Sequence, residues 1–325
     1  MKILITGGAG FIGSHLTAAL LSDPENSVSV IDDLSTGSME NVQKFLPDSR
    51  YRFVRGNILY APELEELVSN CDFIFHLAAA VGVELVVHDP VRTILTNVQG
   101  TERVLTLAAE RGKRFILAST SEVYGKSAKD YFAETDDLLI GPSTHSRWSY
   151  ACSKLMDEFL LMAYCRDKGL NGTVVRFFNT VGPGQTGRYG MVIPRFVSAA
   201  LKGEALKVYG TGGQTRCFCH VADVVRALLL LMKRDDVSGE IFNIGSQESI
   251  TIRELAEFVI GRTGSSSAIE VVPYEKAYAA GFEDMLHRAP DCSKLHSLCG
   301  WKAEIPLKSI IDDVAAEIRM RSQTA

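Results

Sequence analysis

The chain has 325 residues, of which 46% are hydrophobic and 22% are charged, the balance of an ordinary globular protein. Its formal net charge of −5 argues against general affinity for nucleic acid or for an anionic membrane, so we expect neither partner. The first residues, MKILITGGAG, hold no apolar segment long enough for a signal peptide, and ALLLLM at 227–232 is too short to cross a bilayer. We therefore expect a cytoplasmic protein.

Short β-branched runs alternate with helix-like segments along the first half of the chain. The runs are KILIT (2–6), SVSVID (27–32), YRFVRGN (51–57), DFIFHLAA (72–79), RFILAST (114–120) and TVVRFFN (173–179). This alternation predicts an α/β fold with a Rossmann-type, doubly wound parallel sheet. The pattern changes at the glycine-rich segment 181–190. We therefore expect one domain over 1–179, with return segments near 216–245, and a smaller mixed α/β C-terminal lobe over 180–325.

The segment ITGGAGFIG (5–13) follows the first strand directly and opens a helix. Gly7, Gly10 and Gly13 have the spacing that lets a tight turn bring backbone close to a pyrophosphate, with the positive helix N-terminus facing its charge. The strand, the helix and an acid downstream are all in place. We therefore predict dinucleotide contacts from the following residues: Gly7, Gly10, Phe11, Ile12 and Gly13.

An acidic pair closes the second predicted strand. Asp32 comes 19 residues after Gly13, where a carboxylate would accept hydrogen bonds from the adenosine ribose and repel the 2′-phosphate of NADP. The sequence therefore predicts NAD as the cofactor. Asp33 either joins this contact or only caps a turn. Asn57 and Ile58 end the third strand, where they could contact the adenine.

Tyr150 and Lys154 are four residues apart in SYACSK, on one face of a predicted helix. A free phenol has a pKa near 10. The neighbouring ammonium and a positively charged nicotinamide would lower that pKa, so Tyr150 could act as a base near neutral pH. Thr120 ends the strand before this helix and could supply a hydroxyl to the same centre.

Eight segments together carry a resemblance that spans essentially the whole chain. They are TGGAGFIG, DDLSTG, HLAA, STSEVYG, YACSK, RFFNTVGP, YGTGGQTR and HRAPD. The chain resembles the extended short-chain dehydrogenase/reductases that act on nucleotide sugars. The resemblance implies tightly held NAD, oxidation of the sugar at C4, and then epimerisation, dehydration or decarboxylation of the 4-keto intermediate. It also implies a homodimer built on the helices that follow the fourth strand and that bear YACSK.

The resemblance assigns the N-terminal domain to NAD and the C-terminal lobe to the nucleotide sugar. It adds cofactor contacts to those named above: Thr36, Gly37, Leu77, Ala78, Ala79, Asn97, Ser119, Tyr150 and Lys154. For Asn97 a role in ordering the active-site helix and backbone is also expected.

The sequence Thr120–Ser121–Glu122 looks like that of UDP-glucuronate decarboxylases, whereas simple 4-epimerases tend to lack this acid. Arg147 and Arg288 also match positions in the decarboxylases. The resemblance implies that Glu122 and Arg288 assist loss of CO2, with Arg147 at the sugar, and it gives a catalytic set of Thr120, Glu122, Tyr150, Lys154 and Arg288. Alternatively, Glu122 caps a turn, Arg288 binds the diphosphate, and Arg147 packs beside Trp148.

The resemblance also gives expected contacts with the substrate. Asn179 and Arg216 would bind the diphosphate, and Tyr209 would lie beside the base, although KVYGTGGQTR (207–216) could instead be a plain hairpin turn. The remaining expected contacts are Val81, Arg92, Ser121, Arg147, Lys207 and Arg288. One departure is that VGVELVV (81–87) lacks the tyrosine usual in decarboxylases.

Three functions follow from these patterns. The first is NAD-dependent decarboxylation of UDP-glucuronate to UDP-xylose or its 4-keto form. The second is a UDP-glucose or UDP-glucuronate 4-epimerase that uses the same NAD cycle. The third, a catalytically idle NAD-binding sensor, would not require Thr120, Tyr150 and Lys154. The seven cysteines and seven histidines show no metal-binding spacing, so we expect no metal.

Overall fold

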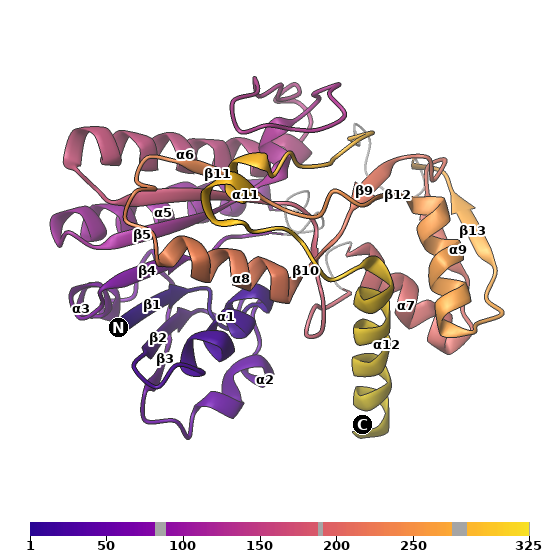
Figure 1. The fold of residues 1–325 in the computed structure, drawn as a ribbon, viewed down its shortest axis with the longest axis horizontal. Helices are drawn as coiled ribbons and strands as arrows, with labels where there is room; N and C mark the ends of the chain where they lie inside the picture. Colours follow the sequence, from indigo (N-terminus) through magenta and orange to yellow (C-terminus); the bar gives the residue numbers. More distant parts are fainter. Residues whose placement is uncertain (82–88, 188–190, 275–284, 325) are drawn as a thin grey trace.

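The computed structural model describes residues 1–81, 89–187, 191–274 and 285–324. Seven strands form one parallel sheet in the order β11-β6-β5-β4-β1-β2-β3 (Figure 1). They are β1 (Lys2–Thr6), β2 (Ser27–Asp32), β3 (Tyr51–Arg55), β4 (Phe73–His76), β5 (Arg114–Thr120), β6 (Gly172–Phe177) and β11 (Ile241–Ile244). This confirms the expected doubly wound sheet. The strand order reverses between β1 and β4, and ligands of such sheets bind outside the carboxyl ends of the strands at this point.

Helices cover both faces of the sheet, as a sheet that is buried on both sides requires. One face carries α1 (Phe11–Leu21) and α8 (Val221–Met232). The other carries α3 (Glu63–Ser69), α5 (Pro90–Glu110) and α6 (Arg147–Lys168). The sheet residues between these layers are almost all apolar and fully buried, so the strand ends that bear polar side chains are held rigidly.

The smaller lobe has an apolar core of its own, between three helices and one pair of strands. These are α7 (Val192–Lys202), α9 (Ile252–Thr263), α12 (Leu307–Thr324), β8 (Leu206–Tyr209) and β13 (Ile269–Val272). Strand β8 pairs in parallel with β13, and β9 (Thr215–Cys217) pairs antiparallel with β12 (Ser249–Thr251). The simple hairpin interpretation of 207–216 is therefore wrong, because its two strands pair with other partners.

The chain returns from the smaller lobe to the sheet twice. The first return runs through β10 (Cys219–His220), α8 and β11, where a return segment was expected. The second is α11 (Ser293–Cys299), which packs against β11. The remaining short elements are α2 (Met39–Val42), η1 (Gln43–Phe45), η2 (Ser121–Tyr124) and β7 (Thr180–Val181). A search of the described helices finds none with the length and apolar character needed to cross a membrane.

Candidate functional site

A cavity of about 900 Å³ runs from the glycine loop, past the carboxyl ends of the sheet strands, into the smaller lobe. Nearly all of the residues expected at the site line it. The expected residues that do not line it are Asn97, Lys154 and Lys207. Lys207 is exposed on β8 and borders a separate hollow, so the predicted substrate contact from Lys207 has no support in this geometry. The volume lies at the upper end of the range for ligand pockets, as two large ligands would require.

The glycine loop is shaped by contacts that leave no room for side chains. Gly7 has a φ of +75°, and a Cβ there would lie 2.7 Å from the amide nitrogen of Ala78. A Cβ on Gly13 would lie 2.6 Å from the carbonyl oxygen of Gly7. Gly10 is the N-cap of α1 and has no side chain to satisfy the free amides of the first turn. The first turn of α1 therefore forms a cradle of backbone N–H groups beside the cavity, suited to an anion.

Asp32 lies at the end of β2, on the floor of the same cavity. Its carboxylate accepts hydrogen bonds from the amides of Ala9 (3.0 Å) and Leu34 (2.8 Å). Burial raises its pKa from the ordinary value, and the two amide bonds oppose that rise. The cradle and this buried carboxylate fit the diphosphate and the ribose of NAD, respectively.

Asp33 is engaged within the protein. It accepts from the amide of Ser35 and from Nδ2 of Asn57, both at 2.8 Å. These bonds agree with the turn-capping alternative for Asp33. They also give Asn57 a role in holding the turn that follows β2, although both residues line the cavity.

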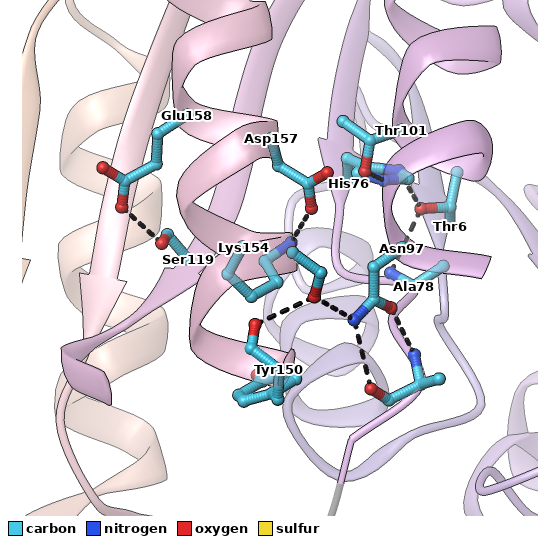
Figure 2. Close-up of polar contacts among 12 residues, drawn as sticks. Thr6, His76, Ala78, Asn97, Thr101, Ser119, Tyr150, Lys154, Asp157 and Glu158 are labelled. Carbon is cyan, nitrogen blue, oxygen red and sulfur yellow. Dashed lines mark hydrogen bonds and ion pairs between the residues drawn. The ribbon is translucent and has the colours of Figure 1, made fainter. Parts of the chain in front are cut away.

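Tyr150 lies in the first turns of α6, and its hydroxyl is hydrogen-bonded to the Thr120 side chain at the end of β5. Burial, with the charges of Glu122 and Asp157, raises the pKa of Tyr150 above its usual value. The lowering expected from the Lys154 ammonium does not outweigh these effects in the protein without cofactor. The ammonium donates to Oδ2 of Asp157 at 2.6 Å, so part of its charge is offset inside the protein (Figure 2).

Asn97 has the backbone-ordering role considered for it. Its Oδ1 accepts from the amide of Ala80 at 2.7 Å, and its Nδ2 donates to the Ser153 hydroxyl at 3.0 Å (Figure 2). The Ser153 hydroxyl in turn donates to the carbonyl oxygen of Tyr150 at 2.8 Å. These bonds tie the loop after β4 to the helix that carries Tyr150.

Glu122 lies between two guanidinium groups in the part of the cavity near Tyr150. Its Oε1 accepts from Nη1 of Arg288 at 3.0 Å and lies 3.8 Å from Nη2 of Arg147. Arg288 also donates to Oδ1 of Asn179. The cap of the turn η2 is Thr120, whose hydroxyl accepts from the Glu122 amide at 3.2 Å. The Glu122 carboxylate is thus committed to the arginine pair rather than to the N-cap bond.

The part of the cavity in the smaller lobe is lined from the segment before β7 and from α7, β8 and β9. Asn179 donates to the carbonyl oxygen of Cys217 at 2.8 Å, and Arg216 donates to the carbonyl oxygen of Met285 at 2.7 Å. Both side chains line the cavity while buried bonds fix their orientation. The guanidinium of Arg195 lies 4.4 Å from the ring centre of Tyr209.

Several residues of the site were missed by sequence reasoning. Arg195, Tyr274 and Arg321 line the cavity from α7, the segment after β13 and α12. Ser119 donates to Glu158 at 2.5 Å, and Glu158 forms a buried ion pair with Arg176. Arg195, Arg321, Glu158 and Arg176 lie in helices or strands whose local pattern is that of ordinary amphipathic structure, so only the tertiary fold reveals their place near the site. Within the described parts of the chain, no group of three His, Cys, Asp or Glu side chains could hold a metal ion.

Fold and site together define a Rossmann-type nucleotide-binding protein with a Thr–Tyr–Lys centre. The family model for the NAD dependent epimerase/dehydratase family matches residues 3–245, and the chain belongs to this family. Membership confirms the expected family and the expectation of NAD as cofactor.

Relatives with assigned activities cover nearly all of the chain. The UDP-N-acetyl-alpha-D-glucosaminuronate decarboxylase of Bacillus cytotoxicus is 43% identical over 299 residues, 92% of this chain and 91% of that protein. The UDP-glucuronic acid decarboxylase 3 of Arabidopsis thaliana is 37% identical over 331 residues, 99% of this chain and 90% of that protein.

Among solved structures, the UDP-glucuronic acid 4-epimerase from Bacillus cereus, in complex with UDP-glucuronic acid and NAD, is similar to this chain. It has a TM-score of 0.88 and 28% identity, and the match covers 99% of this chain and 100% of that one.

Proposed function

We propose that the protein is an NAD-dependent decarboxylase of a UDP-hexuronate, with UDP-glucuronate as the first substrate to test. The observation that carries this proposal is the Glu122–Arg288 ion pair, which lies in the same cavity as Tyr150 and Thr120. A sugar whose C4 hydroxyl reaches Tyr150 would direct its C5 substituent toward these charges. A carboxylate on C5 suits a guanidinium.

The chemistry needs little beyond these side chains. Tyr150 takes the proton of the C4 hydroxyl, assisted by the Thr120 hydroxyl. NAD supplies the acceptor for the C4 hydride when it is bound. The product is a β-keto acid, whose C5–carboxylate bond breaks as its electron pair moves toward the C4 oxygen, leaving CO2 and an enolate.

Stabilising the enolate oxygen and protonating C5 complete the step. The Tyr150 hydroxyl can donate to the enolate oxygen. Arg288 can orient the carboxylate before it leaves, and Glu122 can direct a proton to C5. The product is a UDP-4-keto-pentose, or UDP-xylose if the hydride returns to C4.

The similarity to the Bacillus cytotoxicus protein suggests a second substrate, a UDP-uronate with an acetamido group at C2. That relative is named for a 2-acetamido uronate, at 43% identity, whereas the Arabidopsis protein, at 37%, is named for UDP-glucuronic acid. The two substrates differ at C2 and share the C5 carboxylate on which the proposal depends. UDP-N-acetylglucosaminuronate is therefore the second substrate to test.

Incubation with each UDP-uronate, followed by mass spectrometry, tests the proposal. The expected result is a UDP-pentose, or UDP-2-acetamido-pentose, lighter by one CO2, or its 4-keto form, lighter by a further two hydrogens. The Tyr150→Phe variant should form none of these products. A product of unchanged mass, with the C4 configuration inverted, would instead identify a 4-epimerase such as the structural relative from Bacillus cereus. Binding of NAD without turnover of any UDP-sugar would favour the sensor.

We also propose a homodimer built on α5 and α6. These two helices pack side by side, and together they expose five large apolar side chains. The five are Val91, Ile94, Leu95, Met156 and Phe159. An apolar face of this kind is typical of a protein interface. The cytoplasmic location expected from the sequence stays a prediction.

A further inference from the structure

A buried aspartate, Asp157, is the direct partner of Lys154, and the chemistry described above leaves it without a role. The Nζ of Lys154 donates to Oδ2 of Asp157 at 2.6 Å, and the two side chains are 2% and 0% exposed. Removing a carboxylate and an ammonium from water costs several kcal/mol per ion, which their mutual attraction offsets only when the geometry is good. On α6, Lys154 lies about one helical turn beyond Tyr150 and Asp157 about two turns beyond it.

On its other side Asp157 faces polar side chains (Figure 2). Burial raises the pKa of its carboxyl, and the Lys154 ammonium and the Thr101 hydroxyl of α5 oppose that rise. The same hydroxyl lies 3.0 Å from Nε2 of His76, whose Nδ1 lies 2.8 Å from the Thr6 hydroxyl. A row of polar side chains from α5, β4 and β1 thus lies behind the catalytic helix, beside the carboxylate. The 2.6 Å bond to Asp157 fixes the position of the Lys154 ammonium.

The charges around Tyr150 come from two directions. Glu122 and Arg288 face it from the sugar side, and Asp157 and Lys154 lie behind it on α6. Glu158, on the same helix, is paired with Arg176. His76 stays neutral, because burial and the Lys154 charge lower its pKa to about 3. Asp157 is therefore a fixed negative charge that acts on both members of the Tyr–Lys pair.

We propose that Asp157 is a positioning residue that sets the proton affinity of the Tyr150 base by anchoring and neutralising the Lys154 ammonium. In the protein without NAD⁺, the balance of charges keeps the proton on the phenol. The positive charge of bound NAD⁺ is then needed to make Tyr150 a base. The enzyme would in this way couple deprotonation of Tyr150 to the oxidised cofactor. The inference rests on the base role of Tyr150 within the proposed function, and not on the decarboxylation step.

The direct test is the pKa of the Tyr150 phenol in the NAD⁺ complex, measured for the full-length protein by NMR with carbon-13-labelled tyrosine rings. The Tyr150 signal is assigned from its absence in Tyr150→Phe. In Asp157→Asn, one negative charge several ångströms away is lost, and the pKa should fall by about one unit. An unchanged or higher pKa overturns the proposal. If Asp157→Asn fails to fold, Asp157→Ser removes the same charge and leaves room for a water on Lys154.

Two further variants distinguish an effect of the Asp157 charge on the Tyr150 pKa from an effect of a less stable fold. Asp157→Glu keeps the charge, and its Tyr150 pKa should stay close to that of the wild type. Glu158→Gln breaks the neighbouring buried ion pair with Arg176 and should destabilise the fold without lowering the Tyr150 pKa. If the Tyr150 pKa fell as far in Glu158→Gln as in Asp157→Asn, the proposal would be overturned. Loss of any buried acid on α6 would then lower this pKa, and Asp157 would have no special role.

A kinetic measurement adds a second readout. The acid limb of NAD reduction by UDP-glucuronate should move to lower pH by about one unit in Asp157→Asn. If the wild type reduces its NAD but releases no CO2, the proposed decarboxylation fails while this inference still stands. If UDP-glucuronate does not reduce NAD at all, the NMR titration decides the inference alone.

Discussion

Arg288 donates from Nη1 to Oε1 of Glu122 over 3.0 Å, although 166 positions separate the two residues in the chain. The pair joins the turn after β5 to the segment before α11, so it spans the two lobes within the cavity, near Tyr150. Both side chains are mostly buried, at 12% and 19% exposure, which makes the contact less screened than a surface ion pair. It is the relationship on which the proposed reaction most depends.

The first prediction concerns Glu122. Glu122→Gln should fold and bind NAD, but it should consume UDP-glucuronate more slowly by about 100- to 10,000-fold, the usual contribution of a general acid–base group. The measurement is CO2 release under single-turnover conditions. A residue that served only as a turn cap would instead cost about 1 kcal/mol of stability and little activity.

Arg288 provides the control for that prediction. If orientation of the carboxylate and proton delivery belong to one step, the losses in Glu122→Gln and Arg288→Ala should not add in the double variant. Fully additive losses would show that the two residues act independently.

The second prediction concerns Tyr150. Tyr150→Phe should abolish reduction of bound NAD while leaving the affinity for the UDP-sugar largely unchanged, because only the phenol proton acceptor is lost. Stopped-flow absorbance of NADH, with calorimetric binding of UDP-glucuronate, checks both parts. Reduction at a rate near that of the wild type would mean that another group is the base.

The third prediction concerns cofactor choice. Asp32→Ala should lower the affinity for NAD by about 10- to 100-fold, which is the loss expected for hydrogen bonds to a charged acceptor. The affinity for NADP should change much less. Asp33→Ala is the matched control: its carboxylate is bound to Ser35 and Asn57, so the NAD-to-NADP ratio should stay as in the wild type. Titration of both cofactors measures the ratios, and equal affinities in the wild type would contradict the assignment.

The fourth prediction concerns assembly. The wild type should be a dimer by light scattering at micromolar concentration. Phe159→Asp places a charge on a side chain that is 64% exposed in the single chain, in the middle of the proposed interface, and should yield monomers. Leu46→Asp, at a residue 52% exposed near β3, is the control and should leave the dimer intact. A monomeric wild type would refute the interface.

The sheet could be predicted from the sequence because its signals are local. Each β-branched run lies within one strand, and the glycine spacing reflects contacts made inside a single strand–turn–helix unit. Asp32 and the Tyr150–Lys154 spacing could be found for the same reason.

Other features depend on pairings that no local pattern specifies. Asp157 is one acid among several on α6, and its burial against Lys154 follows only from the packing of α5 on α6. Likewise, the local sequence of 207–216 is typical of a hairpin, but in the fold β8 pairs with β13 and β9 pairs with β12. The absence of a tyrosine at 81–87 cannot be related to the cavity, since 82–88 lie outside the described residues.

The fifth prediction concerns His76, a fully buried histidine whose pKa is lowered to about 3 by burial and by the Lys154 charge. A histidine in the unfolded chain has a pKa near 6.5. The unfolded state therefore binds more protons below that value, so this group favours folding above pH 6.5 and loses that contribution as the pH falls toward 3. Between pH 7 and pH 5 the loss from His76 alone should be about 2 kcal/mol.

Urea unfolding at pH 7 and pH 5 measures this loss. His76→Asn keeps polar groups for Thr6 and Thr101 but cannot titrate, so its free energy of unfolding should fall by about 2 kcal/mol less than that of the wild type over this interval. The variant should be less stable at pH 7, because an imidazole is lost from a close-packed site. His287→Asn, at an exposed histidine, is the control and should keep the wild-type difference. An equal pH dependence in His76→Asn and wild type would show that His76 is not held neutral by the fold.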